Sequence, residues 1–217
     1  MKLSKYIDHT LLKADASEAA IKRLCDEAKE YDFKSVCVNP SNIEICKKEL
    51  QGTNVLICTV IGFPLGAMST EAKVFEASDA VMKGADEVDM VINIAKLKDE
   101  KYDYCIEEIK RIKRACNNKT LKVILETCLL TDNEIVEGCK CVIKGGADFV
   151  KTSTGFSTGG ATFDAVKLMK ETVGNSCKIK AAGGVRNHAD MLKMIELGAD
   201  RIGTSSGTKL VTINEEI

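Results

Sequence analysis

The chain has 217 residues, of which 45% are hydrophobic and 29% are charged, enough for one large domain with a substantial core. Its 31 basic and 32 acidic residues give a net charge of -1, which offers no electrostatic case for nucleic acid or an anionic membrane as a partner. We therefore expect a single domain over residues 1–217 that binds a small molecule.

Three features of the sequence indicate the cellular compartment and the metal content: the cysteines, the histidines and the first residues. Ten cysteines are scattered through strand-like and helix-like segments, and residues 1–10 lack the continuous apolar stretch of an export signal. We therefore expect a cytoplasmic protein with reduced thiols. Only two histidines are present, His9 and His188, and no zinc-ligand spacing occurs, so we expect neither a metal nor a cofactor.

Short apolar runs alternate along the chain with amphipathic stretches. The predicted strands, in chain order, are residues 6–9, 35–39, 55–61, 87–93, 121–126, 149–152, 178–182 and 201–204. The predicted helices include residues 17–31 between the first two strands, and residues 70–83, 101–115 and 131–144. The last of these opens with a capping box of Thr131 and Glu134.

The tripeptide Gly-Ala-Asp occurs three times, beginning at Gly84, Gly146 and Gly198. Each copy follows a helical pattern and precedes a strand-like run, so its glycine is expected to end the helix in the left-handed conformation. Strands alternating with helices predict a parallel sheet. Eight such units favour a closed (β/α)₈ barrel, with an open doubly wound sheet as the alternative. Because the chain stops at Ile217, we expect an abbreviated final helix.

Charged residues inside three of these strands indicate where chemistry occurs, since barrel active sites lie at the carboxyl ends of the strands. Period-two alternation can point Asp89, Lys151 and Lys180 into the barrel, while the residues before them, Val88, Val150 and Ile179, face the helices. The fourth and sixth strands are alternate strands of the barrel, whose inward side chains fill the same layer, so Asp89 and Lys151 can meet across the interior. Lys180 lies on the strand next to Lys151.

This trio has two interpretations. A structural network of ion pairs closing the barrel mouth would use the same residues. However, two lysines and one aspartate carry a surplus positive charge, which is relieved most easily when one lysine loses its proton. A neutral amine attacks an aldehyde or ketone to give a Schiff base, which permits carbon-carbon cleavage as in class I aldolases. An ammonium on Lys180 would promote proton loss from Lys151 by like-charge repulsion.

Glycine and serine follow the last two predicted strands, in K-A-A-G-G-V-R from Lys180 to Arg186 and I-G-T-S-S-G from Ile202 to Gly207. Glycines let an anion reach backbone N–H groups, and these two loops commonly bind phosphate in such barrels. A phosphorylated substrate is the favoured interpretation. The alternative is that Gly183 and Gly184 only make a turn and that Arg186 is a surface residue.

At these residues the sequence resembles the deoxyribose-phosphate aldolases over nearly its whole length. The segments that carry the resemblance are I-D-H-T-L-L, E-V-D-M-V-I-N, F-V-K-T-S-T-G-F, K-A-A-G-G-V-R and I-G-T-S-S-G. The resemblance implies a Schiff base on Lys151, with Lys180 as the second active-site lysine and Asp89 as its partner in moving protons through water. It also implies that 2-deoxy-D-ribose 5-phosphate is degraded to D-glyceraldehyde 3-phosphate and acetaldehyde.

The resemblance further places a set of small residues around the substrate phosphate: Gly155, Gly183, Gly184, Ser205 and Ser206. Cys37 is interpreted as a buried structural thiol, with a place in the pocket wall as the alternative. Two other classes are weighed: a metal-dependent aldolase, which would need clustered histidine and carboxylate ligands, and a sugar-phosphate sensor, which would not need Lys151. A homodimer stays open, because the sequence does not fix the oligomeric state.

Overall fold

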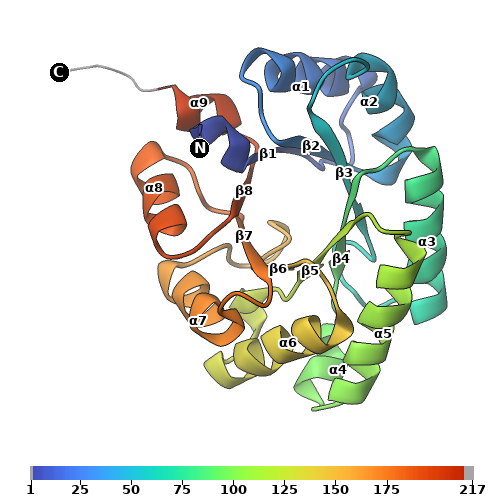
Figure 1. The fold of residues 1–217 in the computed structure, drawn as a ribbon, viewed down its shortest axis with the longest axis vertical. Coiled ribbons are helices and arrows are strands. Elements are labelled where there is room, and N and C mark those ends of the chain that lie inside the picture. The colour runs from blue at the N-terminus through green and yellow to red at the C-terminus, as the bar shows by residue number, and fades with distance from the viewer. Residues whose placement is uncertain (1, 213–217) are drawn as a thin grey trace.

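The computed structural model describes residues 2–212 and contains a closed barrel of parallel strands that follow one another in chain order (Figure 1). The strands are β1 (Ile7–Leu11), β2 (Ser35–Val38), β3 (Leu56–Ile61), β4 (Glu87–Val91), β5 (Thr120–Ile124), β6 (Phe149–Lys151), β7 (Lys178–Ala182) and β8 (Arg201–Thr204). Pairing of β1 with β8 closes the ring. The predicted barrel is confirmed, and the open-sheet alternative is wrong.

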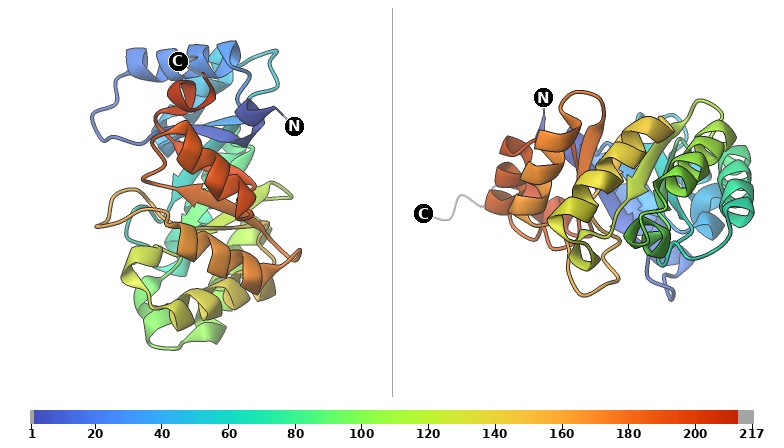
Figure 2. Two further views of the ribbon diagram at one scale, coloured as in Figure 1. Left: turned by 90° about the vertical axis from the view of Figure 1, so that its left-hand side faces the viewer. Right: turned by 90° about the horizontal axis from the view of Figure 1, so that it is seen from below.

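Helices lie outside the strands on every side seen in the turned views (Figure 2). They are α1 (Glu18–Glu30), α2 (Ile43–Glu49), α3 (Thr70–Lys83), α4 (Ile94–Lys98), α5 (Tyr102–Ala115), α6 (Asp132–Gly145), α7 (Phe163–Val173), α8 (His188–Glu196) and α9 (Gly207–Val211), with 3₁₀ turns η1 (Leu3–Tyr6), η2 (Pro40–Asn42) and η3 (Thr127–Leu129). The helix predicted between the first two strands is α1. Within the described residues, α9 is the short final helix. Every helix in residues 2–212 is too short or too polar to cross a lipid bilayer.

Side-chain caps set where several helices begin. Ser17 and Ser69 accept hydrogen bonds from backbone N–H groups in the first turns of α1 and α3, and the capping box of Thr131 and Glu134 is formed at α6. The first strand was predicted one residue too early and ends later than predicted. Tyr6 belongs to η1, and β1 continues to Leu11 because it still pairs with β2 there.

The three Gly-Ala-Asp repeats link helix ends to strand starts. Gly84, Gly146 and Gly198 have φ of 118°, 75° and 109°, as predicted for the left-handed end of a helix. The aspartates have a second role, which sequence analysis did not predict: their carboxylates accept a backbone N–H from an earlier strand. Asp86 binds Ile57 N, Asp148 binds Leu121 N and Asp200 binds Ile179 N, at distances between 2.8 and 3.1 Å.

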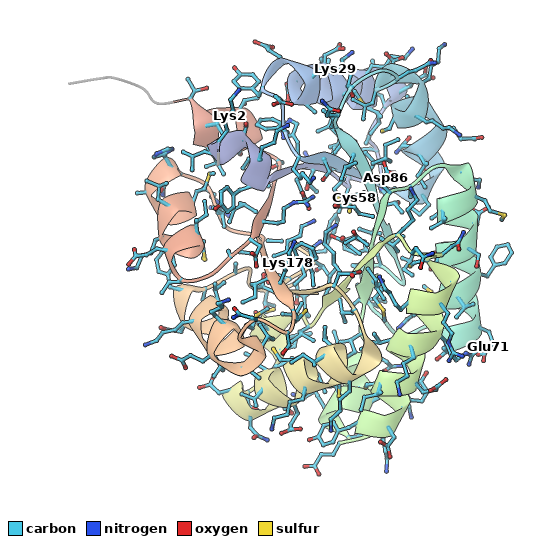
Figure 3. The ribbon with its side chains drawn as sticks, viewed as in Figure 1. Lys2, Lys29, Cys58, Glu71, Asp86 and Lys178 are labelled. Carbon is cyan, nitrogen blue, oxygen red and sulfur yellow. The ribbon has the colours of Figure 1, made fainter. Side chains whose placement is uncertain are left out.

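Alternation along the strands separates two regions of the interior. Val88, Val150 and Ile179 are fully or almost fully buried in the apolar layer between strands and helices, as predicted. Inside the barrel a smaller apolar cluster contains Leu12, Cys37, Cys58 and Val60. Figure 3 shows Cys58 toward the middle of the molecule, whereas Glu71 lies on the outer side of α3. Seven buried charged residues on the strands form the site: Asp8, Glu87, Asp89, Lys122, Lys151, Lys180 and Arg201.

We expect Asp200→Ala to lower the free energy of unfolding by about 1–3 kcal/mol, because it removes the charged acceptor of Ile179 N beside Lys180. Urea denaturation of the variant and of Asp200→Asn, which keeps an acceptor oxygen, measures the effect. Equal stability of Asp200→Ala and the parent protein would contradict this role of the carboxylate.

Candidate active site

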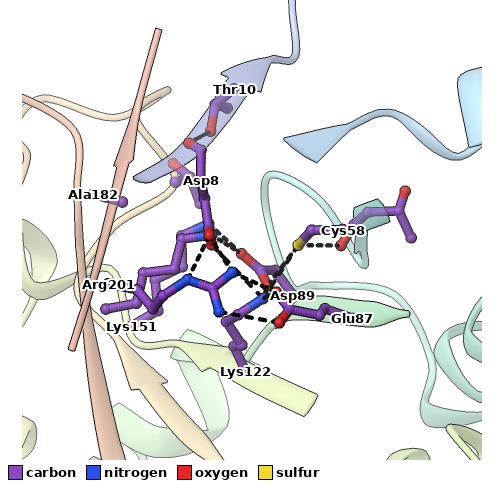
Figure 4. A network of polar contacts seen from close by, with 12 residues as sticks. Asp8, Thr10, Cys58, Glu87, Asp89, Lys122, Lys151, Ala182 and Arg201 are labelled. Atoms are coloured by element: carbon purple, nitrogen blue, oxygen red, sulfur yellow. Dashed lines mark hydrogen bonds and ion pairs between the residues drawn. The ribbon is translucent and has the colours of Figure 1, made fainter. Parts of the chain in front are cut away.

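Asp89 lies at the centre of the charged interior and accepts hydrogen bonds from three lysines (Figure 4). Its Oδ2 accepts from Lys151 Nζ and Lys180 Nζ, both at 2.8 Å, and its Oδ1 accepts from Lys122 Nζ at 2.8 Å. The thiol of Cys58 also donates to Oδ1, at 3.1 Å. The predicted proximity of Asp89, Lys151 and Lys180 is therefore confirmed.

Strand register explains how these residues meet. Lys151 pairs directly with Lys180 across β6 and β7, and Asp89 pairs directly with Lys122 across β4 and β5. Side chains on alternate strands of a closed barrel fill the same interior layer. The carboxylate on β4 therefore reaches the lysine on β6 across the interior, as predicted.

The network is larger than the predicted trio. Lys180 Nζ lies 2.6 Å from Asp8 Oδ2, and Lys122 Nζ donates to Glu87 Oε2 at 2.6 Å. The Arg201 guanidinium forms ion pairs with both Asp8 and Glu87 (Figure 4). Sequence analysis missed four members, Asp8, Glu87, Lys122 and Arg201. The signal was available, since each is a charge within an apolar strand.

Charge does not balance within this network. Within residues 2–212, Lys122, Lys151, Lys180 and Arg201 face only Asp8, Glu87 and Asp89, which leaves one surplus positive charge if all seven are ionised. The lysines differ in how firmly they are held. Lys180 binds two carboxylates within 2.8 Å, and Lys122 binds two within the same distance, whereas Lys151 binds only Asp89. Lys151 is thus the ammonium with the least electrostatic support.

Buried carboxylates and ammonium groups shift one another's pKa values. Burial alone would raise the pKa of Asp89, but the three ammonium groups outweigh burial and hold that pKa well below its ordinary value. Burial alone would lower the pKa of Lys180, but Asp8 and Asp89 outweigh it and raise that pKa well above its ordinary value. Lys180 therefore stays charged, and so does Asp89.

A cavity of about 470 Å³ opens above the network. Of the three lysines that bind Asp89, only Lys151 lines it, and that side chain is just 3% exposed. All five residues predicted to surround a phosphate line the same cavity: Gly155, Gly183, Gly184, Ser205 and Ser206. Arg186, weighed as a surface residue, is exposed and lines it too, as does Lys13. The structure thus brings the predicted residues together.

The loop after β6 packs directly against the loop after β7. A Cβ on Gly160 would lie 2.4 Å from the carbonyl oxygen of Gly183, so only glycine permits this contact. The N–H groups of Gly155, Gly183 and Gly184 donate to no acceptor in residues 2–212, although these residues line the cavity. Such N–H groups can bind an anion.

Cys37 is fully buried in the apolar cluster inside the barrel and does not line the cavity. It belongs to one of two groups in the described residues that could approach a metal, Cys37 with Cys58 and Asp89; the other is Asp8 with Cys58 and Glu87. The carboxylates of both groups are already paired with lysine or arginine. Those cations would repel a divalent ion.

Residues 2–210 match the family model described as DeoC/LacD family aldolase. The chain belongs to this aldolase family. It is 60% identical to the deoxyribose-phosphate aldolase of Finegoldia magna over 97% of this chain and 99% of that one. It is 58% identical to the deoxyribose-phosphate aldolase of Malacoplasma penetrans over 97% of this chain and 95% of that one.

A solved structure of deoxyribose phosphate aldolase from Aeropyrum pernix, described as tetrameric, superposes on this aldolase with a TM-score of 0.90. The two sequences are 32% identical, and the match covers 96% of this chain and 89% of that one. The match extends the family assignment to the three-dimensional arrangement of the barrel.

Asp8→Asn in this aldolase is expected to lower the free energy of unfolding at pH 7 by about 3–5 kcal/mol, because Lys180 and Arg201 lose a buried carboxylate partner. Burial alone would raise the pKa of Asp8, but Arg201, Lys180 and Lys122 hold it well below its ordinary value. The stabilisation is therefore complete above the unfolded pKa of about 3.9 and is lost as pH falls toward the folded pKa.

Urea denaturation of both proteins between about pH 7 and pH 2 tests this, and the difference in stability should shrink as the solution becomes more acidic. A difference that stays constant with pH would contradict an ionised, stabilising Asp8.

Proposed function

We propose that this aldolase reversibly cleaves 2-deoxy-D-ribose 5-phosphate to D-glyceraldehyde 3-phosphate and acetaldehyde through a Schiff base on Lys151, in the breakdown of deoxyribose phosphate. The observation that carries the proposal is the position of Lys151: it lines the cavity, yet it binds only one carboxylate of a network with a surplus cation. The names of the relatives from Finegoldia magna and Malacoplasma penetrans support the choice of substrate.

The covalent steps follow from amine chemistry. The neutral amine of Lys151 attacks the aldehyde carbon C1 of the open-chain sugar, and loss of water gives a protonated Schiff base. Removal of the proton from the C3 hydroxyl then releases D-glyceraldehyde 3-phosphate, because the electrons of the C2–C3 bond pass into the Schiff base and leave an enamine. Protonation of C2 and addition of water release acetaldehyde and restore the lysine.

Lys180 and Asp89 are suited to move these protons. Lys180 is fully buried behind Lys151, and both ammonium groups bind the same oxygen of Asp89. We propose that the pair exchanges protons with the C3 hydroxyl and with the enamine carbon through water in the cavity. The positive charge on Lys180 also promotes loss of the proton from Lys151, since like charges repel.

Glycine and serine residues that line the cavity suit the phosphate. Gly155, Gly183 and Gly184 offer N–H donors, Ser205 and Ser206 offer hydroxyls, and all five line the cavity. Charge-assisted hydrogen bonds to a phosphate are about twice as strong as bonds between neutral groups. We propose that these residues bind the 5-phosphate and so place C1 at Lys151.

Three broader expectations remain proposals. We propose that residues 1–217 act as one aldolase domain in the cytoplasm, which the ten free thiols support. The tetrameric Aeropyrum pernix relative supports self-association, and a homodimer stays a prediction.

Borohydride in the presence of acetaldehyde or deoxyribose phosphate should trap an adduct on Lys151, because this lysine alone among the three around Asp89 lines the cavity. Mass spectrometry of the digested protein identifies the modified residue, and a sample without aldehyde is the control. Turnover of deoxyribose phosphate should persist in EDTA. A reproducible adduct on Lys180, with Lys151 unmodified, would refute the assignment of the nucleophile.

Lys180→Met should reduce turnover at least about a hundredfold, since proton transfer by a positioned side chain contributes about that much or more. It should also move reductive trapping at Lys151 to more alkaline pH. The sign follows from the charges: without Lys180 the network has three cations for three carboxylates, and Lys151 holds its proton more firmly. The rate of trapping against pH in both proteins measures the shift. An unchanged or lower midpoint would show that burial, not Lys180, controls the nucleophile.

A further inference from the structure

Glu126 follows β5 and combines two features that are unfavourable for a glutamate. Its backbone is left-handed, with φ of 61° and ψ of 62°, a conformation that glycine adopts at much lower cost. The residue is also only 2% exposed, and it forms no ion pair within residues 2–212. A strained, buried carboxylate without a cationic partner at the active-site end of the barrel requires a reason.

The Glu126 carboxylate makes two contacts to Thr154 in the loop after β6, in addition to a long contact at 4.0 Å from the Cys128 thiol to Oε1. Its Oε1 accepts a hydrogen bond from Thr154 N at 3.2 Å, and its Oε2 accepts one from the Thr154 hydroxyl. Both carboxylate oxygens therefore accept from donors of the same residue, Thr154. The Thr154 hydroxyl oxygen in turn accepts from Phe156 N at 3.0 Å. Glu126 thus holds the backbone on both sides of Gly155.

Two further contacts fix the same loop. Thr127 N donates to Thr152 O at 3.0 Å, and the Phe156 ring meets Phe63 edge-on with ring centroids 5.2 Å apart. Between these contacts Gly155 adopts φ of 84°, lines the cavity and leaves its N–H without an acceptor in the described residues. The direction of this N–H therefore depends on the bonds between Glu126 and Thr154.

We propose that Glu126 is a positioning residue that holds the Gly155 N–H toward the substrate phosphate and thereby sets the preference for phosphorylated over unphosphorylated sugar. The inference rests on the proposed function, because the phosphate is that of the proposed substrate. Glu126 touches neither Lys151 nor Asp89 in the described hydrogen bonds, so its effect should fall on phosphate binding and not on the amine chemistry.

Glu126→Gly is the informative variant, because glycine keeps the left-handed backbone while removing the carboxylate. Glu100→Gly is the matched control: Glu100 is the same residue type with φ of 57°, but it is exposed and lies outside the cavity. Thr154→Val removes the hydroxyl through which the carboxylate reaches Phe156 N. The double variant of Glu126→Gly and Thr154→Val tests whether the two residues act as one unit.

Efficiency with deoxyribose phosphate should fall at least about tenfold in Glu126→Gly, mainly through a higher KM, as expected for loss of an oriented charge-assisted bond. Efficiency with unphosphorylated deoxyribose and borohydride trapping by acetaldehyde should stay within about twofold of the parent protein. Thr154→Val should act in the same direction, and the double variant should fall no further than the more affected single variant. Glu100→Gly should change none of these quantities.

An equal loss with both sugars, or an unchanged preference for the phosphorylated sugar, would overturn the inference. If the parent protein cleaves neither sugar, the proposed function fails, and the role of Glu126 is decided by two measurements that need no turnover. Amide hydrogen exchange at Thr154 and Phe156 should be faster in Glu126→Gly but not in Glu100→Gly, and inorganic phosphate should bind more weakly. Unchanged exchange and unchanged phosphate binding would overturn the inference in that case.

Discussion

One carboxylate shared by three ammonium groups is the interaction on which the rest of the site depends. Asp89 reaches Lys122, Lys151 and Lys180 because the barrel is closed and because each residue lies on an inward position of its strand. In a dry interior such charges are tolerated only when they are paired and hydrogen-bonded. Every charged group of the network is paired with an opposite charge, but the cations outnumber the carboxylates by one.

The surplus cation separates a catalytic network from a purely structural one. If every charge were balanced, ion pairing would hold all three lysines as ammonium groups, and none would act as a nucleophile. Here Lys122 and Lys180 are each held by two close carboxylates, whereas Lys151 is held by one and lines the cavity. The lysine with the fewest carboxylate partners therefore lies where the substrate arrives, and Lys180, held by two carboxylates, is bound to the same oxygen of Asp89.

Much of this arrangement could be predicted from the sequence because it follows from local patterns. The Gly-Ala-Asp repeats and the alternating apolar strands predicted the barrel, and the layering of alternate strands predicted that Asp89 and Lys151 meet. Strand ends were less accurate, since Leu11 belongs to β1 only through its pairing with Val38. Asp8, Glu87, Lys122 and Arg201 were missed because the prediction considered the carboxyl ends of the strands and left out the charged layer beneath them.

The backbone conformation and contacts of Glu126 could not be predicted either, and the reason is different. Nothing in the local sequence E-T-C favours a left-handed glutamate, and the conformation is stabilised by bonds to Thr154, which is 28 residues away in the chain. The preference of a single residue for a conformation is a weak signal when tertiary contacts oppose it. The contacts that compensate this backbone exist only in the folded protein, because they join segments far apart in the chain.

The central claim is that Lys151 is the first of the three lysines to give up its proton. An NMR titration of the folded protein with ¹³C-labelled lysine side chains tests it most directly, with the three resonances assigned from single Lys→Met variants. The account predicts that the Lys151 signal titrates at the lowest pH, while Lys122 and Lys180 stay protonated over the same range. Loss of the proton from Lys122 or Lys180 before Lys151 would contradict it.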